Sequence, residues 1–181
     1  MEKYTYNLHQ HNFAAWAAAR AAQRGFKGAN VRRLKETLEE AGLDKFISDD
    51  SNWPSKKSEF DELHSEWCNQ IIGITKRLGV ENPTYGLAAK LVNIYLKATV
   101  VLGPHKDSSL ASIVHPPIDG QLLENMAKDH SLDEELRIIC KRTKWTKMTA
   151  RSYKDLIDKL RENDLHKPHF WLLERYWTVT K

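Results

Sequence analysis

The stretch 82–126, NPTYGLAAKLVNIYLKATVVLGPHKDSSLASIVHPPIDGQLLENM, places the strongest constraint on the fold. It holds the longest apolar run of the sequence. From Tyr85 to Leu102 the apolar residues recur at helical spacing and cover a broad face, which predicts a helix at the centre of the fold. Pro116 and Pro117 then favour an extended backbone. Asp119 follows them where an N-cap belongs, so a second helix is predicted to begin there.

The rest of the chain follows the same helical periodicity. Asn12 and Asn30 are the predicted N-caps of helices over 12–24 and 31–43. Further helices are predicted over 58–78, 132–142 (behind a capping box of Ser131 and Glu134), 149–160 and 169–177. No alternating strand pattern is present, although 112–115 and 177–180 could form short extended segments. We therefore predict an all-α fold of about seven or eight helices, in one domain over residues 1–181.

Composition indicates an ordinary globular protein. Hydrophobic residues make up 41% of the 181 residues and charged residues 29%. No stretch approaches the roughly 18 apolar residues of a membrane span, and the first ten residues do not resemble a secretory signal. Cys68 and Cys140 stand alone and form no C-x-x-C motif. A cytoplasmic location without a membrane partner is therefore expected.

Charge and aromatic content bear on the partner. Lys and Arg exceed Asp and Glu by 28 − 24 = 4, which permits binding to a phosphate backbone. Six tryptophans amid basic residues suit stacking on bases, although most of them are expected in the core. The alanine-rich helix over 12–24 would let a second helix pack closely. The sequence does not indicate an oligomeric state.

Several motifs with known chemistry are absent from the sequence. It contains no G-x-x-x-x-G-K-[ST] or G-x-G-x-x-G phosphate loop, no H-E-x-x-H zinc motif and no G-x-S-x-G elbow. The histidines and cysteines do not follow zinc-ligand spacing. We therefore expect neither a cofactor nor a metal, and the chemical candidates reduce to Lys90 and Asp119.

Four polar positions share one side of the predicted central helix. Gly86, Lys90, Asn93 and Lys97 are separated by steps of three and four residues, which nearly complete helical turns. Such a stripe is most often the solvent side of an amphipathic helix. Because the stripe is narrow, Lys90 is predicted to be partly desolvated, which favours a neutral, nucleophilic amine. Lys97 is the alternative nucleophile.

The segments YGLAAKLVNIYLK and HPPIDGQLL together resemble the core of the helix-hairpin-helix DNA glycosylase superfamily. The resemblance covers residues 82–126 and is nearest to archaeal-type 8-oxoguanine DNA glycosylases. In the lysine-bearing branch of that superfamily, a glycine-containing turn leads into the helix of the nucleophilic lysine. By this resemblance Lys90 matches the nucleophile, Asp119 the catalytic aspartate and Gly86 one glycine of the turn. Ala88 stands where the second glycine is usual.

The resemblance implies a DNA repair glycosylase and AP lyase that acts on an oxidised base through a lysine Schiff base. Asp119 would stabilise positive charge on the deoxyribose and help to deprotonate Lys90. DNA would be the partner, and the target nucleotide would leave the base stack. Gly86, Lys97 and His115 are the predicted contacts with substrate or DNA.

Two other classes of protein fit the same residues. One is a non-enzymatic all-α bacterial protein that binds nucleic acid or another protein. Lys90 and Lys97 would then be surface charges or phosphate contacts, and Asp119 would only cap a helix, a role worth about 1 kcal/mol. The other is a structural or oligomerising helical module, built on the alanine-rich helix.

Overall fold

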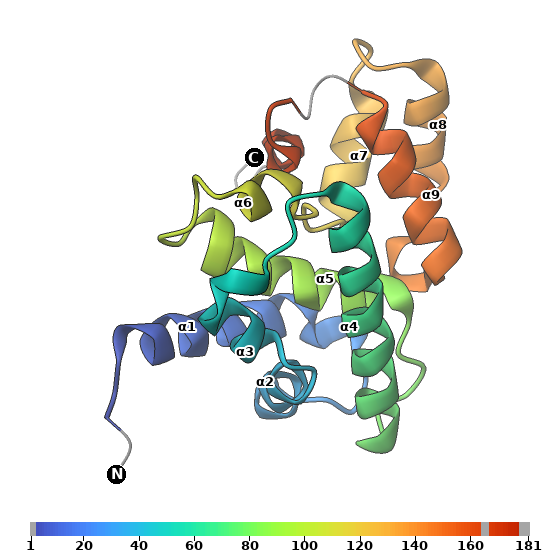
Figure 1. Ribbon diagram of the computed structural model, residues 1–181. Helices are drawn as coiled ribbons and strands as arrows, with labels where there is room; N and C mark the ends of the chain where they lie inside the picture. Colours follow the sequence, from blue (N-terminus) through green and yellow to red (C-terminus); the bar gives the residue numbers. More distant parts are fainter. Residues whose placement is uncertain (1–2, 164–166, 178–181) are drawn as a thin grey trace.

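The computed structural model describes residues 3–163 and 167–177, and within these ranges the fold is all-α, as predicted (Figure 1). No strand occurs there apart from an isolated bridge between Lys27 and Glu81. The α-helices are α1 (Tyr6–Ala22), α2 (Val31–Glu40), α3 (Leu43–Ser48), α4 (Lys57–Arg77), α5 (Tyr85–Leu96), α6 (Ser109–Ile113), α7 (Gly120–Lys128), α8 (Glu134–Arg142) and α9 (Ala150–Arg161). Short 3-10 helices include Trp145–Lys147 and Phe170–Tyr176.

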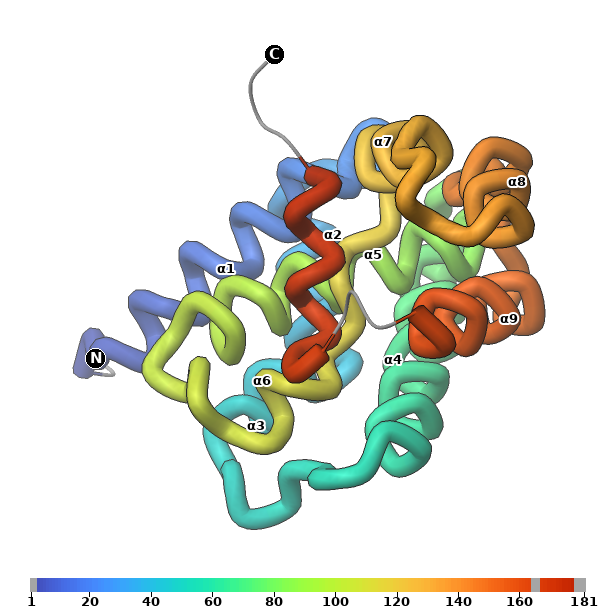
Figure 2. Tube along the Cα trace, turned by 90° about the horizontal axis from the view of Figure 1, so that it is seen from above, coloured from blue at the N-terminus to red at the C-terminus, as the bar shows by residue number. Residues whose placement is uncertain are grey.

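Helix α5 lies at the centre of the fold, as its apolar sequence predicts. It packs against α1, α4, α9 and the 3-10 helix Trp145–Lys147. Figures 1 and 2 show α5 between α1 on one side and the group α7, α8 and α9 on the other. Most of its side chains are buried, in a continuous hydrophobic core that the surrounding helices share. Burial on nearly all sides fixes the direction in which its few polar residues point.

The small residues of α1 are used inside the chain. Five alanines of this helix are almost completely buried, and α1 makes its most extensive contact with α5. Alanine side chains allow two helix backbones to approach closely, which was the property expected of this segment. The buried alanines are Ala14, Ala15, Ala18, Ala19 and Ala22.

Two predicted N-caps are confirmed. The side chain of Asn30 accepts a hydrogen bond from the Arg33 amide, and Asp119 caps α7. The predicted helix over 85–102 is also present, with a π-helical turn, Lys97–Val101, after α5. In that turn the Leu102 amide donates to the carbonyl oxygen of Lys97 at 2.8 Å.

Two other predicted N-caps are wrong. Helix α1 begins at Tyr6, because the side chain of Thr5 caps it by accepting a hydrogen bond from the Leu8 amide. Asn12 lies inside the helix, and its side-chain oxygen accepts a hydrogen bond from Lys35 at 2.7 Å. Helix α8 is capped by Asp133, while the Ser131 hydroxyl donates to Asp129. In both cases a nearby side chain satisfies the polar group that was predicted to cap the helix.

Three other segments differ from their predicted form or lie outside the described ranges. The helix predicted over 31–43 ends at Glu40, because Gly42 adopts a positive φ of 80° before α3 begins. Ser112 and Ile113 belong to α6 and are not extended. Residues 178–180 lie outside the described ranges. Across those ranges, no helix is both long enough and apolar enough to span a membrane.

Candidate functional site

Lys90 and Asp119 meet in the fold, although 29 residues separate them. Lys90 projects from the middle of α5, and Asp119 precedes the first residue of α7. The Lys90 Nζ lies 3.2 Å from Asp119 Oδ2, and the two side chains are only 11% and 13% exposed. The pair is therefore partly shielded from water but not sealed from it.

Asp119 caps its helix and pairs with the lysine at the same time. Its Oδ1 accepts hydrogen bonds from the amides of Gln121 and Leu122, both at 3.1 Å. Its Oδ2 faces Lys90 and also accepts a bond from the Trp177 indole at 3.2 Å. Capping and ion pairing thus use different oxygen atoms, so a structural role and a chemical role are compatible in this residue.

Lys90 is held on its other side by an aromatic ring. Its Nζ lies 4.6 Å from the centre of the Trp145 ring, a cation–π distance. The turn that carries Trp145 approaches α5 closely at Gly86, where an added Cβ would lie 1.9 Å from the Trp145 carbonyl oxygen. The Gly86 amide donates to the Met148 carbonyl oxygen at 3.3 Å. Gly86 therefore makes room for the tryptophan that covers Lys90, and its predicted contact with DNA stays a prediction.

The pair opens into a largely apolar pocket of about 220 Å³ between α1, α5 and the C-terminal 3-10 helix. Its polar lining consists of two lysines and two carboxylates, so its formal charges balance. The lining residues are Phe13, Ala17, Ala21, Lys90, Ile94, Lys97, Ala98, Leu102, Pro117, Asp119, Glu174 and Trp177. A pocket of this size and polarity suits a flat organic group with a few polar atoms.

Lys97, the alternative nucleophile, also faces this pocket. It forms an ion pair with Glu174, and its Nζ lies 5.0 Å from the centre of the Trp177 ring. Burial raises the pKa of Glu174, and Lys97 partly opposes that rise. Lys90 and Lys97 are therefore arranged alike, each with one carboxylate and one tryptophan.

Asn93 departs from the predicted polar stripe. Its side chain is fully buried and hydrogen-bonds to His64, Tyr153 and the Pro116 carbonyl oxygen. Asn93 follows Lys90 by three residues, so it lies about 60° further around the helix. That rotation is enough to turn it from the pocket into the core.

His115 belongs to a buried network and not to the pocket lining. Its Nε2 lies 2.8 Å from Asp61 Oδ1, and its Nδ1 lies 3.2 Å from the Tyr153 hydroxyl. The Arg161 guanidinium binds both oxygens of Asp61 and lies 3.2 Å from His115 Nε2. Burial lowers the pKa of both His115 and His64, whose rings are 4.6 Å apart. The predicted contact of His115 with DNA stays a prediction.

Several residues of the site lie outside 82–126 and were not predicted. Trp145, Glu174 and Trp177 come from the C-terminal quarter of the chain, and Phe13 comes from α1. The sequence signal for them was the density of tryptophans near the C-terminus. Trp67 is buried, and Trp53, Trp145 and Trp171 are partly buried against the core, while Trp16 and Trp177 are exposed. Most of the tryptophans therefore lie in or against the core, as expected.

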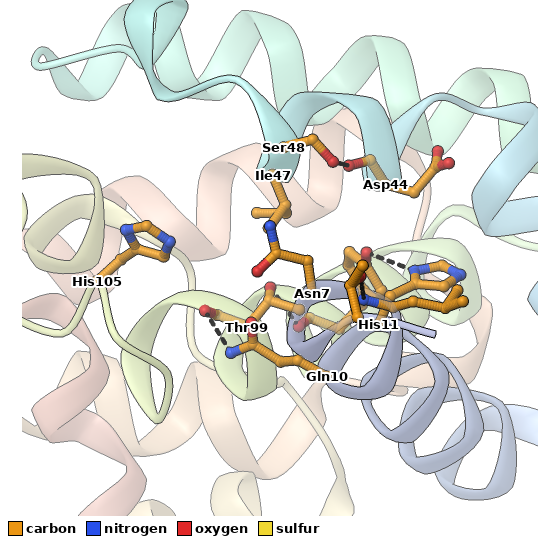
Figure 3. Close-up of a pocket in the computed structure, with 11 residues that line it drawn as sticks. Asn7, Gln10, His11, Asp44, Ile47, Ser48, Thr99 and His105 are labelled. Carbon is orange, nitrogen blue, oxygen red and sulfur yellow. Dashed lines mark hydrogen bonds between the residues drawn. The ribbon is translucent and has the colours of Figure 1, made fainter. Parts of the chain in front are cut away.

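A second pocket, of about 240 Å³, lies between the start of α1, α3 and the π-helical turn (Figure 3). Its labelled side chains include Asn7, Gln10 and His105. His11 joins the Tyr95 hydroxyl to Glu39, at 2.9 Å on each side. None of the predicted site residues lines this pocket.

Within residues 3–163 and 167–177, no group of three or more histidine, cysteine, aspartate or glutamate side chains is placed to hold a metal ion. The candidate chemistry of the first pocket therefore rests on its lysines, carboxylates and aromatic rings. Comparisons of the chain with protein-family models, curated proteins and solved structures gave no match.

Proposed function

We propose that the protein is a DNA glycosylase and AP lyase that removes an oxidised base through a Schiff base on Lys90. The observation that carries this proposal is the 3.2 Å contact between Lys90 Nζ and Asp119 Oδ2 at the wall of an apolar pocket. A nucleophilic lysine needs a nearby group that can take its proton, together with partial exclusion of water. Both conditions are met by these two side chains.

The chemistry follows from the placement of the two groups. Asp119 takes a proton from the Lys90 ammonium, and the free amine attacks C1′ of the deoxyribose as the bond to the base breaks. The base leaves with the bonding electron pair and takes up the proton that Asp119 received, so Asp119 is a carboxylate again and stabilises the positive charge on the sugar. The protonated aminal opens to a Schiff base as its C1′–O4′ bond breaks and a proton passes from the nitrogen to O4′. Asp119 then removes the C2′ proton, and the 3′ phosphate departs with the electron pair of the C3′–O bond by β-elimination.

The pocket suits an extruded base next to the reacting sugar. Phe13 and Trp177 supply aromatic surface, and Glu174 supplies a carboxyl group whose pKa is raised by burial. Enzymes that act on a base extract it from the stack and hold it between aromatic or apolar surfaces. Glu174 and Lys97 are the polar groups that would distinguish one oxidised base from another. A cytoplasmic location forms part of this proposal.

Borohydride trapping tests the proposal. The protein is incubated with duplex DNA that contains 8-oxoguanine, and borohydride is added to reduce any Schiff base to a stable adduct. We expect an adduct with the wild type and none with Lys90→Gln. Asp119→Asn keeps the shape of the side chain, and it should reduce the rate of trapping by at least about 100-fold.

Lys97→Gln distinguishes the two lysines, because Lys97 lines the same pocket with an equivalent carboxylate and tryptophan. It should still form the adduct, although more slowly, because Lys97 contacts the base in this proposal but does not attack C1′. Loss of the adduct in Lys97→Gln together with its retention in Lys90→Gln would transfer the nucleophile to Lys97. If no adduct forms with 8-oxoguanine, with other oxidised bases or with an abasic site, the enzymatic proposal is wrong.

A second candidate function is supported by a different observation. Lys90 and Asp119 satisfy one another, and Phe13 and Trp16 of α1 are more than half exposed. A non-enzymatic protein that binds nucleic acid or another protein would need only such a surface. Salt-dependent binding of undamaged DNA or RNA without any trapped adduct would favour this function.

A further inference from the structure

One edge of α1 is aromatic and exposed. Phe13 and Trp16 are 61% and 52% exposed, and the centres of their rings are 6.0 Å apart. The opposite face of the same helix holds the buried alanines that pack on α5. Large aromatic side chains rarely stay exposed as neighbouring pairs unless a partner covers them.

The same edge carries unpaired positive charge. Residues 3–35 contain seven basic residues and no acidic one, so the charge of this segment exceeds the net charge of the whole chain, which is +4. Arg20 and Arg24 of this segment are exposed, and neither makes an ion pair within the described ranges. By contrast, Arg32 and Lys35 pair with Glu36 and Glu39. On α1 and in the turn that follows it, Arg20 and Arg24 are therefore free to contact an anion.

This edge begins at the mouth of the pocket. Phe13, Ala17 and Ala21 of α1 all line it. Arg20 follows Phe13 by seven residues, which places it near the same side of α1. Arg24 lies just beyond the end of α1, in the 3-10 helix Gln23–Gly25. At about 1.5 Å per residue, Phe13 and the last residue of α1, Ala22, are roughly 14 Å apart along the axis. The edge is long enough to contact several consecutive nucleotides.

We propose that this edge of α1, formed by Phe13, Trp16, Arg20 and Arg24, binds an unpaired stretch of a nucleic-acid strand. Bases stack on Phe13 and Trp16, and phosphates lie against Arg20 and Arg24. Such a combination of aromatic rings and basic residues is the common means of binding single strands without sequence preference. The inference rests on the proposed function only in identifying this strand as the one that leads into the pocket.

Charge and shape together favour this partner over others. A helix that lies on a lipid surface needs a broad apolar face, but the apolar face of α1 is already buried against α5. A second copy of the chain would bring the same concentration of positive charge to the interface, which is unfavourable. An anionic polymer with flat apolar groups complements both the arginines and the rings.

The test measures binding of a fluorescein-labelled single-stranded oligodeoxynucleotide without a damaged base, by fluorescence anisotropy at several salt concentrations. Phe13→Ala/Trp16→Ala should weaken binding by at least about 30-fold at every salt concentration, because stacking of one base on each of two rings is removed. Arg20→Gln/Arg24→Gln should lower the slope of log Kd against log salt by about 1.4, that is about 0.7 for each phosphate that an arginine no longer neutralises. Circular dichroism verifies that the variants fold.

The matched control is Arg32→Gln/Arg151→Gln, which removes two exposed arginines from outside this edge and should leave both affinity and salt slope unchanged. Equal weakening in the control and the Arg20/Arg24 variant would overturn the proposal. So would unchanged binding in the aromatic variant, or equally tight binding of a blunt duplex. Tighter binding to phosphatidylserine vesicles than to the oligonucleotide would instead assign the edge to a lipid surface.

The trapping assay and the binding measurements, both made on the wild type and on the variants of this edge, separate this inference from the proposed enzyme. An adduct in the trapping assay with no role for α1 in binding would reject the inference and leave the enzyme. Binding through α1 without any adduct would reject the enzyme and leave the inference.

Discussion

The Lys90–Asp119 pair and the Asp61–His115–Arg161 cluster are both assembled from distant parts of the chain, but they differ in what surrounds them. In the cluster, hydrogen bonds continue inward through Tyr153 and Asn93 to His64, so its polar groups contact one another. The pair faces a pocket, and its lysine lies beside an aromatic ring. A closed network of this kind stabilises the fold, whereas an open pair keeps a polar surface for a ligand.

The largest effect is expected from breaking the cluster. Asp61→Ala should cost about 3 kcal/mol of unfolding free energy, because it leaves the Arg161 guanidinium, 11% exposed, without its two charged hydrogen bonds. The partial exposure of Asp61 keeps the cost near the lower end for buried pairs. Urea denaturation measures it. Asp158→Ala removes the partner of exposed Lys154 and should cost less than about 1 kcal/mol. Equal costs would show that the cluster is no more than a surface ion pair.

A pH titration of stability tests whether the two buried histidines stay neutral. Burial lowers the pKa of His64 and His115, and Arg161 opposes protonation of His115 while Asp61 and Asp158 favour it. In the unfolded chain each histidine takes up a proton near pH 6.5, whereas in the folded chain it does not. Stability should therefore fall as the pH decreases below about 6.5, by up to about 1.4 kcal/mol per pH unit for each histidine.

The measurement is the urea midpoint between pH 7.5 and pH 5 at constant ionic strength, with values chosen to bracket about pH 6.5. His64→Gln should reduce the pH slope whatever its effect on stability at neutral pH. A wild-type midpoint independent of pH across this range would mean that the buried rings carry protons in the folded state.

Local sequence patterns predicted the helices, and the resemblance predicted the pairing of Lys90 with Asp119. Periodicity identified α5 as central, and the position of Asp119 after two prolines identified the start of α7. Neither pattern indicates which residues outside 82–126 contact these two helices. Glu174 pairs with Lys97 across 77 residues, and Arg161 pairs with Asp61 across 100. Because helical spacing defines a face but not what packs on it, such contacts had no local signal.

The error at Asn93 has the same physical origin. A polar residue near Lys90 on a helical wheel was expected to share its surroundings, but a central helix has a different neighbour on each side. His64 and Tyr153 reach α5 from α4 and α9, so a side chain about 60° from Lys90 is enclosed by polar partners. The exposed edge of α1 was not predicted, because the many alanines of this segment indicated only that a second helix packs closely against it.

Smaller effects are expected at the open pair. Asp119→Ala should cost about 1 to 2 kcal/mol because the α7 cap is removed, with a further contribution from leaving Lys90 unpaired. Lys90→Met should cost less than Asp61→Ala, because Asp119 keeps its bonds from two amides and from Trp177. Asp133→Ala removes the cap of α8, where the aspartate has no lysine partner within the described ranges. The unfolding free energy lost in Asp133→Ala therefore measures the contribution of an N-cap without an ion pair.

The double variant Lys90→Met/Asp119→Ala completes the comparison by giving the coupling energy of the pair. We expect a coupling smaller than the cost of Asp61→Ala, because three other donors still stabilise the Asp119 carboxylate when Lys90 is replaced. A larger coupling, equal to the cost of Asp61→Ala, would show that the pocket pair is as structural as the cluster. The distinction between the two regions would then disappear.

The smallest effect concerns Glu174, where the pH dependence has the opposite sign. Burial raises the pKa of Glu174, so the folded chain holds this proton at a pH where the unfolded chain has released it. Its contribution to stability is therefore greatest in acid and disappears as the pH rises through the folded pKa. Carbon NMR of the glutamate carboxyl groups follows the titration. Lys97→Met should raise the pKa further, since the lysine opposes the effect of burial, and Lys106→Met should leave it unchanged. A lower pKa in Lys97→Met would mean that Lys97 does not stabilise the carboxylate. With the expected result, a lower pH decreases the stability through His64 and His115 but increases it through protonation of Glu174. The two regions therefore change the stability of the protein with pH in opposite directions.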